Sequence, residues 1–279
     1  MSESVQRNPR LAFDVSVSDH VARVVLKGPG KGNALGPDFW REAPGVFDEI
    51  DADPDIRAVV LSGAGDNFTF GLDLSAMTSE LRYALAAPAM AAERTRFLDQ
   101  LTTMQRAIIS LMSCRKPVVA SISGWCVGAG VDVACAADVR VCSSEARFSV
   151  RAVRVGIVED MGVLQRLPAI IGEGAARELC LTGEDFDSAK AAALGLVNHV
   201  DDTPEAALQH ALEIATRIAA NPPLTVQGVK RVMNERAHAG VRDSLHYTAL
   251  WNATFMQSRD FAEAISAFTE KREPKFEGR

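Results

Sequence analysis

Short apolar runs alternate with helix-like segments along the first part of the chain, and this alternation is the strongest constraint on its fold. Residues 58–61 and 117–122 have the length and composition of buried strands. Apolar residues recur at helical spacing over 37–50 and 164–171, and 80–112 also reads as mostly helical. Strands that alternate with helices predict an α/β fold.

The two ends of the chain add a strand pair and a helical region. Residues 11–17 and 21–26 are expected to form two antiparallel strands. From Pro204 onward the pattern is almost entirely helical, with prolines and glycines as breaks. The chain is therefore expected to divide into an α/β core over residues 1–200 and a helical region over 201–279.

The charge balance argues against several classes of partner. The chain has 30 Lys and Arg against 36 Asp and Glu, a net charge of −6, and no basic block. Such a chain is a poor candidate for nucleic acid or an anionic membrane surface. The most apolar stretch, 118–141, contains Asp132, Asp138 and Arg140. It therefore predicts buried strand and helix, not a membrane span.

Cysteines and histidines give no metal or disulfide signature. The five cysteines include no C-x-x-C pair, and the five histidines show no H-E-x-x-H. We expect no metal and no disulfide framework, and a reduced, cytoplasmic compartment. No G-x-S-x-G motif is present, so a serine hydrolase would lack its nucleophile. Residues 1–10 lack the apolar region of a signal peptide.

Two glycine-containing segments are candidate sites of close backbone approach to a ligand: 67–74 and 123–132. A helix that begins near Ala129 and Gly130 leaves backbone N–H groups and the positive end of its dipole free. Such groups can stabilise a developing oxyanion. Alternatively, these glycines serve only close packing. Neither G-x-G-x-x-G nor a P-loop is present, which argues against a dinucleotide or nucleotide site.

Three carboxylates near these segments are candidate acids or bases. Asp132 lies in the first turn of the expected helix, where it could simply complement the helix dipole. Glu159 and Asp160 precede an apolar helix, and Asp160 could instead be the N-cap of that helix over 161–167.

The chain resembles a known family. Several motifs match, in unbroken order, those of the crotonase (enoyl-CoA hydratase/isomerase) superfamily. They are K-G-N-A-L at 31–35, F-T-F-G-L-D-L at 68–74, G-W-C-V-G-A-G-V-D at 124–132, G-I-V-E-D-M-G-V-L-Q-R-L-P at 156–168, A-A-A-L-G-L-V-N-H-V at 191–200 and the final F-T-E-K-R-E-P-K-F-E-G-R. The Δ3,5-Δ2,4-dienoyl-CoA isomerases are the most similar members.

The resemblance implies a fold and a site. The fold is a spiral of repeated β-β-α turns followed by helices that mediate oligomerisation and cover coenzyme A. The backbone N–H groups of Leu72 and Ala129 form the oxyanion hole, with Ala129 where the family usually has glycine. Asp132 and Asp160 are the catalytic acids.

The resemblance also implies binding residues and partners. A coenzyme A thioester is the substrate, no cofactor is permanently bound, and the assembly is a homotrimer or homohexamer. Residues expected to contact the substrate or its coenzyme A are Lys31, Asn33, Ala34, Phe70, Gly71, Asp73, Leu74, Trp125, Gly128, Glu159, Phe268 and Lys271; Lys27 is a further candidate for a phosphate contact.

One residue departs from the family pattern. Hydratases and dienoyl-CoA isomerases usually have glutamate where this chain has Ala152, and a methyl group transfers no proton. The leading expectation is dienoyl-CoA or enoyl-CoA isomerisation in fatty-acid β-oxidation, through an enolate. The alternatives are enoyl-CoA hydration, another reaction of the superfamily such as thioester hydrolysis or decarboxylation, and acyl-CoA binding with little catalysis.

Overall fold

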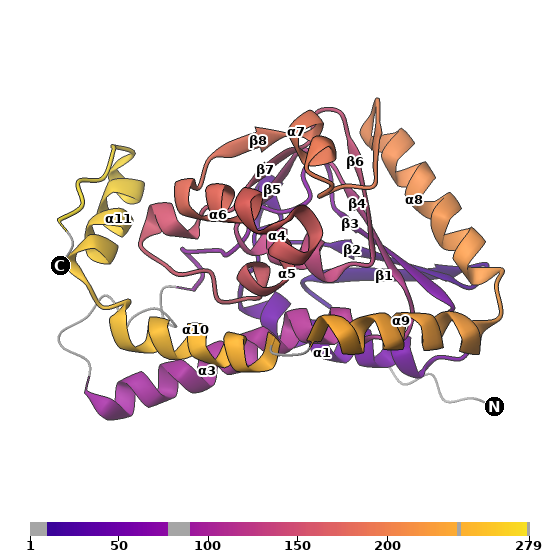
Figure 1. The fold of residues 1–279 in the computed structure, drawn as a ribbon, viewed down its shortest axis with the longest axis horizontal. Coiled ribbons are helices and arrows are strands. Elements are labelled where there is room, and N and C mark those ends of the chain that lie inside the picture. The colour runs from indigo at the N-terminus through magenta and orange to yellow at the C-terminus, as the bar shows by residue number, and fades with distance from the viewer. Residues whose placement is uncertain (1–9, 78–89, 239–240, 278–279) are drawn as a thin grey trace.

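Two β-sheets form the centre of the structure, a computed structural model that describes residues 10–77, 90–238 and 241–277 (Figure 1). The larger sheet has six strands in the order β1-β2-β3-β4-β6-β9. Its strands are β1 (Phe13–Ser18), β2 (Val21–Leu26), β3 (Ala58–Gly63), β4 (Val118–Ile122), β6 (Val139–Ser143) and β9 (His199–Asp201). β1 and β2 pair antiparallel, as predicted, and each later neighbouring pair is parallel.

The central strands β3 and β4 of the larger sheet are apolar because both of their faces are covered. In β3, Ala58 and Val60 pack in one cluster with Ala211 and Ile214 of α8 (Pro204–Ala219). The intervening residues of β3 belong to the main core on the opposite face. Successive side chains of β3 point to opposite faces of the sheet, and both faces are covered by apolar clusters, so the whole run is hydrophobic.

The smaller sheet completes the repeated turn that was expected. It contains β5 (Trp125–Val127), β7 (Arg147–Ser149) and β8 (Asp185–Asp187). The chain passes from β4 in the larger sheet to β5 in the smaller one, and α4 (Ala129–Ala136) then returns it to the larger sheet at β6. The next step, from β6 to β7, again leads from the larger sheet to the smaller one. The predicted α/β class and the β-β-α spiral are therefore confirmed.

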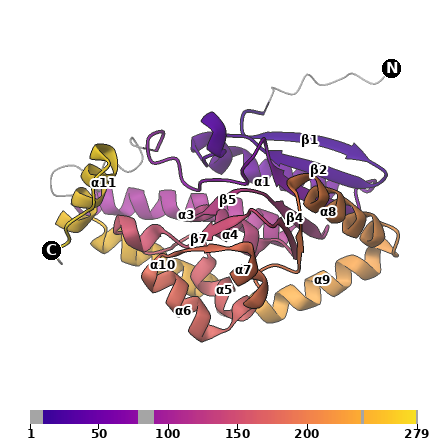
Figure 2. The same cartoon turned by 90° about the horizontal axis from the view of Figure 1, so that it is seen from above.

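Helices enclose the two sheets. The remaining elements are η1 (Gly30–Gly32), α1 (Pro37–Ala52), α3 (Ala91–Ser113), η2 (Ala152–Val155), α5 (Val163–Ile171), α6 (Glu173–Thr182), α7 (Ser188–Ala193), α9 (Pro223–His238), α10 (Val241–Phe255) and α11 (Arg259–Glu270). α10 packs along α3, and both views show the pair beside α5 (Figures 1 and 2). No helix in the described ranges is long and apolar enough to span a bilayer.

Sequence patterns missed the shortest elements. β5, β8 and β9 have three residues each, too few to show a period of two. Residues 68–74 form no strand and make only isolated bridges, from Thr69 to Cys126 and from Leu72 to Leu35. Of the helix expected over 80–112, residues 80–89 lie outside the described ranges. The division at residue 200 stays a prediction, although α8 packs on the sheet itself.

Candidate active site

The two glycine-containing segments lie against each other. Thr69 and the β5 strand exchange backbone hydrogen bonds: Thr69 N–H donates to the Trp125 carbonyl at 3.0 Å, and Val127 N–H donates to the Thr69 carbonyl at 3.0 Å. Gly71 has φ +78°, and a Cβ there would overlap the Val127 carbonyl oxygen and lie 3.2 Å from the Ala129 nitrogen. Glycine is required at position 71 because the backbone of the second segment occupies the side-chain position.

Two backbone N–H groups at this junction have no acceptor in the described part of the chain. Leu35 N–H donates to the Gly71 carbonyl at 2.7 Å, and Asp73 N–H donates to the Leu35 carbonyl at 3.2 Å. The N–H of Leu72, between them, points away from Leu35 because groups alternate along extended backbone. Ala129 is the first residue of α4, where N–H groups lack intrahelical acceptors. The pair fits the predicted oxyanion hole, which remains a prediction.

Asp132 lies one helical turn beyond Ala129 and is fully buried. Its Oδ1 accepts a hydrogen bond from Val163 N–H at 2.5 Å, while Oδ2 has no partner within the described ranges. Burial raises the pKa of this carboxyl well above its ordinary value, and the nearby carboxyl of Glu159 raises it further. A buried oxygen without a partner is costly as a carboxylate, so the neutral acid is the stable form.

The same contact decides how α5 begins. The alternative that Asp160 caps this helix is wrong, because the N-cap position is Gly162 and no side chain caps it there. Instead, Asp132 from α4 accepts the hydrogen bond of the first helical N–H, at Val163. The carboxyl group of Asp132 thus satisfies the first N–H of the next helix, and joins the second glycine-containing segment to the start of α5.

Asp160 is held in that loop by contacts from α10 and α3. Its Oδ2 accepts a hydrogen bond from Asn252 Nδ2 at 2.6 Å, and its backbone carbonyl accepts one from Gln105 Nε2 at 2.8 Å. Burial raises the pKa of Asp160 to about 6, and the hydrogen bond from Asn252 limits that rise. At neutral pH this carboxyl is mainly ionised.

Glu159 is the third buried carboxyl. Its Oε1 accepts a hydrogen bond from Ala152 N–H at 3.0 Å. Burial raises its pKa to about 7, with Asp160 contributing in the same direction. Asp132, Glu159 and Asp160, called the carboxylate cluster below, therefore influence one another's protonation. Within the described residues, no three metal-binding side chains come together as a metal site.

Three contacting residues were not foreseen from the sequence: Gln105, Arg166 and Asn252. Each is a polar side chain that is nearly fully buried. Asn252 also donates to the Val158 carbonyl at 2.7 Å and accepts from Val158 N–H at 3.2 Å. Buried Arg166 lowers the pKa of Asp132, against the larger effect of burial. The available signal was a polar residue next to small apolar ones at helical spacing, such as Asn252 beside Ala249 and Ala253.

The expected coenzyme A loop lies beside the first glycine-containing segment. Asn33 is buried, and its Nδ2 donates to the carbonyls of Ala64 and Asn67 at 2.7 and 2.8 Å, so its side chain holds the loop. Phe70 is half exposed beside Gly32. Asp73 accepts from Ala76 N–H at 2.9 Å.

The remaining expected contacts are more scattered. Ala34, Leu74 and Gly128 are partly buried, and Phe268 is exposed on α11, which ends before Lys271. The Lys31 side chain lies outside what the structure describes, and Lys27 forms an ion pair with Asp14 at 2.7 Å.

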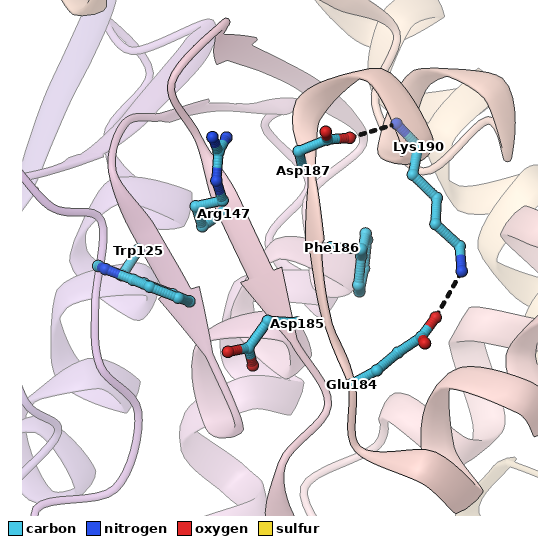
Figure 3. Close-up of a pocket in the computed structure, with 7 residues that line it drawn as sticks. All are labelled: Trp125, Arg147, Glu184, Asp185, Phe186, Asp187 and Lys190. Carbon is cyan, nitrogen blue, oxygen red and sulfur yellow. Dashed lines mark hydrogen bonds and ion pairs between the residues drawn. The ribbon is translucent and has the colours of Figure 1, made fainter.

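Trp125 lies over a separate hollow of about 500 Å³ (Figure 3). The hollow is lined by Trp125, Arg147, Glu184, Asp185, Phe186, Asp187 and Lys190. Lys190 pairs there with Glu184, and Arg151 lies over the indole ring, 5.7 Å from its centroid. No member of the carboxylate cluster lines this hollow, so the structure does not bring Trp125 together with the predicted catalytic acids.

Comparisons with known proteins identify the family and support the fold. Residues 16–279 match the family model described as enoyl-CoA hydratase/isomerase. The chain is 38% identical to a peroxisomal Δ(3,5)-Δ(2,4)-dienoyl-CoA isomerase of Arabidopsis thaliana over 92% of both chains. It is 38% identical to the mitochondrial protein of that name from Homo sapiens, over 93% of this chain and 79% of that one. A solved enoyl-CoA hydratase/isomerase from Pseudoalteromonas atlantica superposes with a TM-score of 0.82 at 26% identity, covering 95% of this chain and all of that one.

Proposed function

Because the chain belongs to the enoyl-CoA hydratase/isomerase family, we propose that it converts 3,5-dienoyl-CoA thioesters to 2,4-dienoyl-CoA thioesters in fatty-acid β-oxidation. The observation that carries the proposal is the position of the carboxylate cluster. One member of the cluster, Asp132, lies in the first turn of α4, one helical turn from the Ala129 N–H, and interacts with Glu159.

The oxyanion hole makes the first step accessible. The thioester oxygen accepts hydrogen bonds from Leu72 N–H and Ala129 N–H, which makes the C2 protons of the substrate acidic. Asp160 removes one of these protons, and the electron pair of the C2–H bond passes into a conjugated enolate. A proton then returns further along the chain, and the double bonds move by one position each.

The protonation states of the cluster suit this chemistry. Asp160, with a pKa of about 6, is ionised at neutral pH and serves as the base. Asp132, whose pKa burial raises far more, stays protonated and offers the hydrogen on Oδ2 to the enolate. Neighbouring carboxyls with separated pKa values are a recurring acid–base arrangement.

The substrate is tested by incubating the full chain with a 3,5-dienoyl-CoA and, separately, a 2-enoyl-CoA. We expect a product of unchanged mass from the dienoyl-CoA, with its two double bonds conjugated to the thioester. A product heavier by one water would instead assign hydration. Tight thioester binding without turnover of either compound would overturn the proposal in favour of a non-catalytic acyl-CoA-binding protein.

The proposal includes the wider setting of the enzyme. The coenzyme A thioester enters as substrate, no permanently bound cofactor takes part, and the chain assembles as a homotrimer or homohexamer. A cytoplasmic location stays a prediction, since the relatives described above are named for peroxisomes and mitochondria.

Asn252 is expected to tune the base. Replacing Asn252 by alanine removes a hydrogen bond that stabilises ionised Asp160, so the pKa of Asp160 should rise above about 6. The base is active only when ionised, so the acidic limb of the pH profile of kcat/KM should move to higher pH. Asn221→Ala, at an exposed position after α8, is the control and should leave the limb in place. An unshifted limb in Asn252→Ala would exclude Asp160 as the titrating base.

A further inference from the structure

Glu159 combines features that a purely structural glutamate lacks. It is buried with 8% of its surface exposed, and in the described part of the chain it forms no ion pair with a lysine or arginine. Within the described ranges, its one hydrogen bond comes from Ala152 N–H. A single neutral donor does not compensate the burial of a charge, and the neighbouring carboxyl of Asp160 adds repulsion. Glutamine at this position would keep the same contact at lower cost.

The contact with Ala152 matters because this residue has no carboxyl group of its own. Ala152 begins η2 and presents only a methyl group. The Glu159 side chain reaches back from the 157–162 loop and places its carboxyl at the backbone of residue 152. The cluster thus holds a carboxyl at η2 although residue 152 provides none.

The two adjacent acids are anchored by different elements of the fold. Glu159 binds the backbone of η2, whereas Asp160 binds Asn252 of α10. Two carboxyls held apart in this way can serve two carbons of one substrate. A 3,5-to-2,4 shift requires two such carbons, because the proton leaves C2 and must be delivered to C6, four bonds away.

We propose that Glu159 is a catalytic residue that delivers the proton to C6 of the dienoyl chain, in place of a side chain at residue 152. This inference rests on the proposed isomerase function. Asp160 accepts the C2 proton, and the electrons of that bond form the C2=C3 double bond. The C3=C4 pair becomes C4=C5, and the C5=C6 pair forms the new C6–H bond with the proton from Glu159. Proton exchange with solvent returns Glu159 to its acid form and Asp160 to its ionised form.

Deuterium exchange separates the two proton transfers. In D₂O, Glu159→Gln should lose isomerisation of 3,5-dienoyl-CoA by roughly 10²-fold or more, the usual contribution of a positioned acid. It should still exchange the C2 protons of the substrate, because Asp160 and the oxyanion hole remain. Mass spectrometry of recovered substrate and product measures both rates. Glu145→Gln, at an exposed position on the β6–β7 connection, is the matched control and should change neither.

A rescue experiment tests the position of the carboxyl. Glu159→Ala should be inactive in isomerisation. Adding Ala152→Glu to this variant should restore part of the activity, because it supplies a carboxyl from residue 152, next to the position that the Glu159 carboxyl occupied. Full isomerisation by Glu159→Gln would overturn the assignment, as would loss of both exchange and isomerisation in a variant that unfolds like the parent. If the unchanged chain neither exchanges nor isomerises, the proposed function fails instead, so the two failures are distinguishable.

Discussion

Replacing Asp160 by asparagine is expected to lower kcat for dienoyl-CoA isomerisation by roughly 10²- to 10⁴-fold, the usual contribution of a positioned general base. Exchange at C2 should fall with it, because the base acts before the enolate exists. KM should change little, since asparagine preserves the shape of the side chain and can still accept the hydrogen bond from Asn252. Steady-state kinetics and C2 exchange in D₂O measure the effect.

The same substitution should stabilise the protein at high pH. The pKa of Asp160 is raised in the folded state to about 6, so its contribution to stability is complete at low pH and is lost as the pH rises through that value. Asparagine does not ionise, and at pH 8 the variant should gain up to about 3 kcal/mol in free energy of unfolding. Asp48→Asn, exposed on α1, is the control. An active variant would refute the role of Asp160, and a destabilised one would refute its raised pKa.

Replacing Ala129 by proline should reduce kcat by roughly 10²- to 10³-fold, equivalent to about 2.7–4 kcal/mol of transition-state stabilisation. Proline lacks the N–H that we assign to the oxyanion hole. Ala129 is the first residue of α4, a position where proline is well accepted because the N–H there has no intrahelical acceptor. The substitution thus removes the donor with little effect on the helix. Thermal unfolding, measured beside the kinetics, should show a midpoint close to that of the parent.

Ala129→Gly provides the matched control for this change. Glycine keeps the backbone N–H and removes only a methyl group, so turnover should stay within a few-fold of the parent chain. Equal losses in both variants would indicate that the side chain or the helix start matters and not the donor. Normal turnover in Ala129→Pro would contradict the predicted oxyanion hole.

Local pattern was sufficient to predict the longer elements of the core and the start of α4. The alternation in β3 follows from burial on both faces, and the start of α4 follows from the small residues at 128–130. Pattern could not reveal which side chain meets which. Asn252 and Asp160 are 92 residues apart in sequence, and Gln105 and Asp160 are 55 apart. Such contacts depend on how helices pack, and no local spacing encodes that.

The alternative interpretation of Asp160 as a helix cap illustrates the same limit. Locally, an aspartate before an apolar helix is a sound N-cap. In three dimensions Asp132, from an earlier helix, reaches the Val163 N–H first, and Asp160 turns to Asn252 instead. Competition among acceptors from distant segments therefore decided the role of each carboxyl.

The anchoring of the 157–162 loop by Asn252 has a consequence for biogenesis. The base, Asp160, is hydrogen-bonded by Asn252 of α10, which follows it by 92 residues, and the oxyanion donors and the other two acids lie earlier still in the chain. The strands of both sheets are therefore synthesised before the helix that supplies the Asn252 contact to the acidic loop. The hydrogen bond from Asn252 forms only after α10 has been synthesised and has packed on α3, so the contact that lowers the pKa of the base is a late event in the assembly of the site.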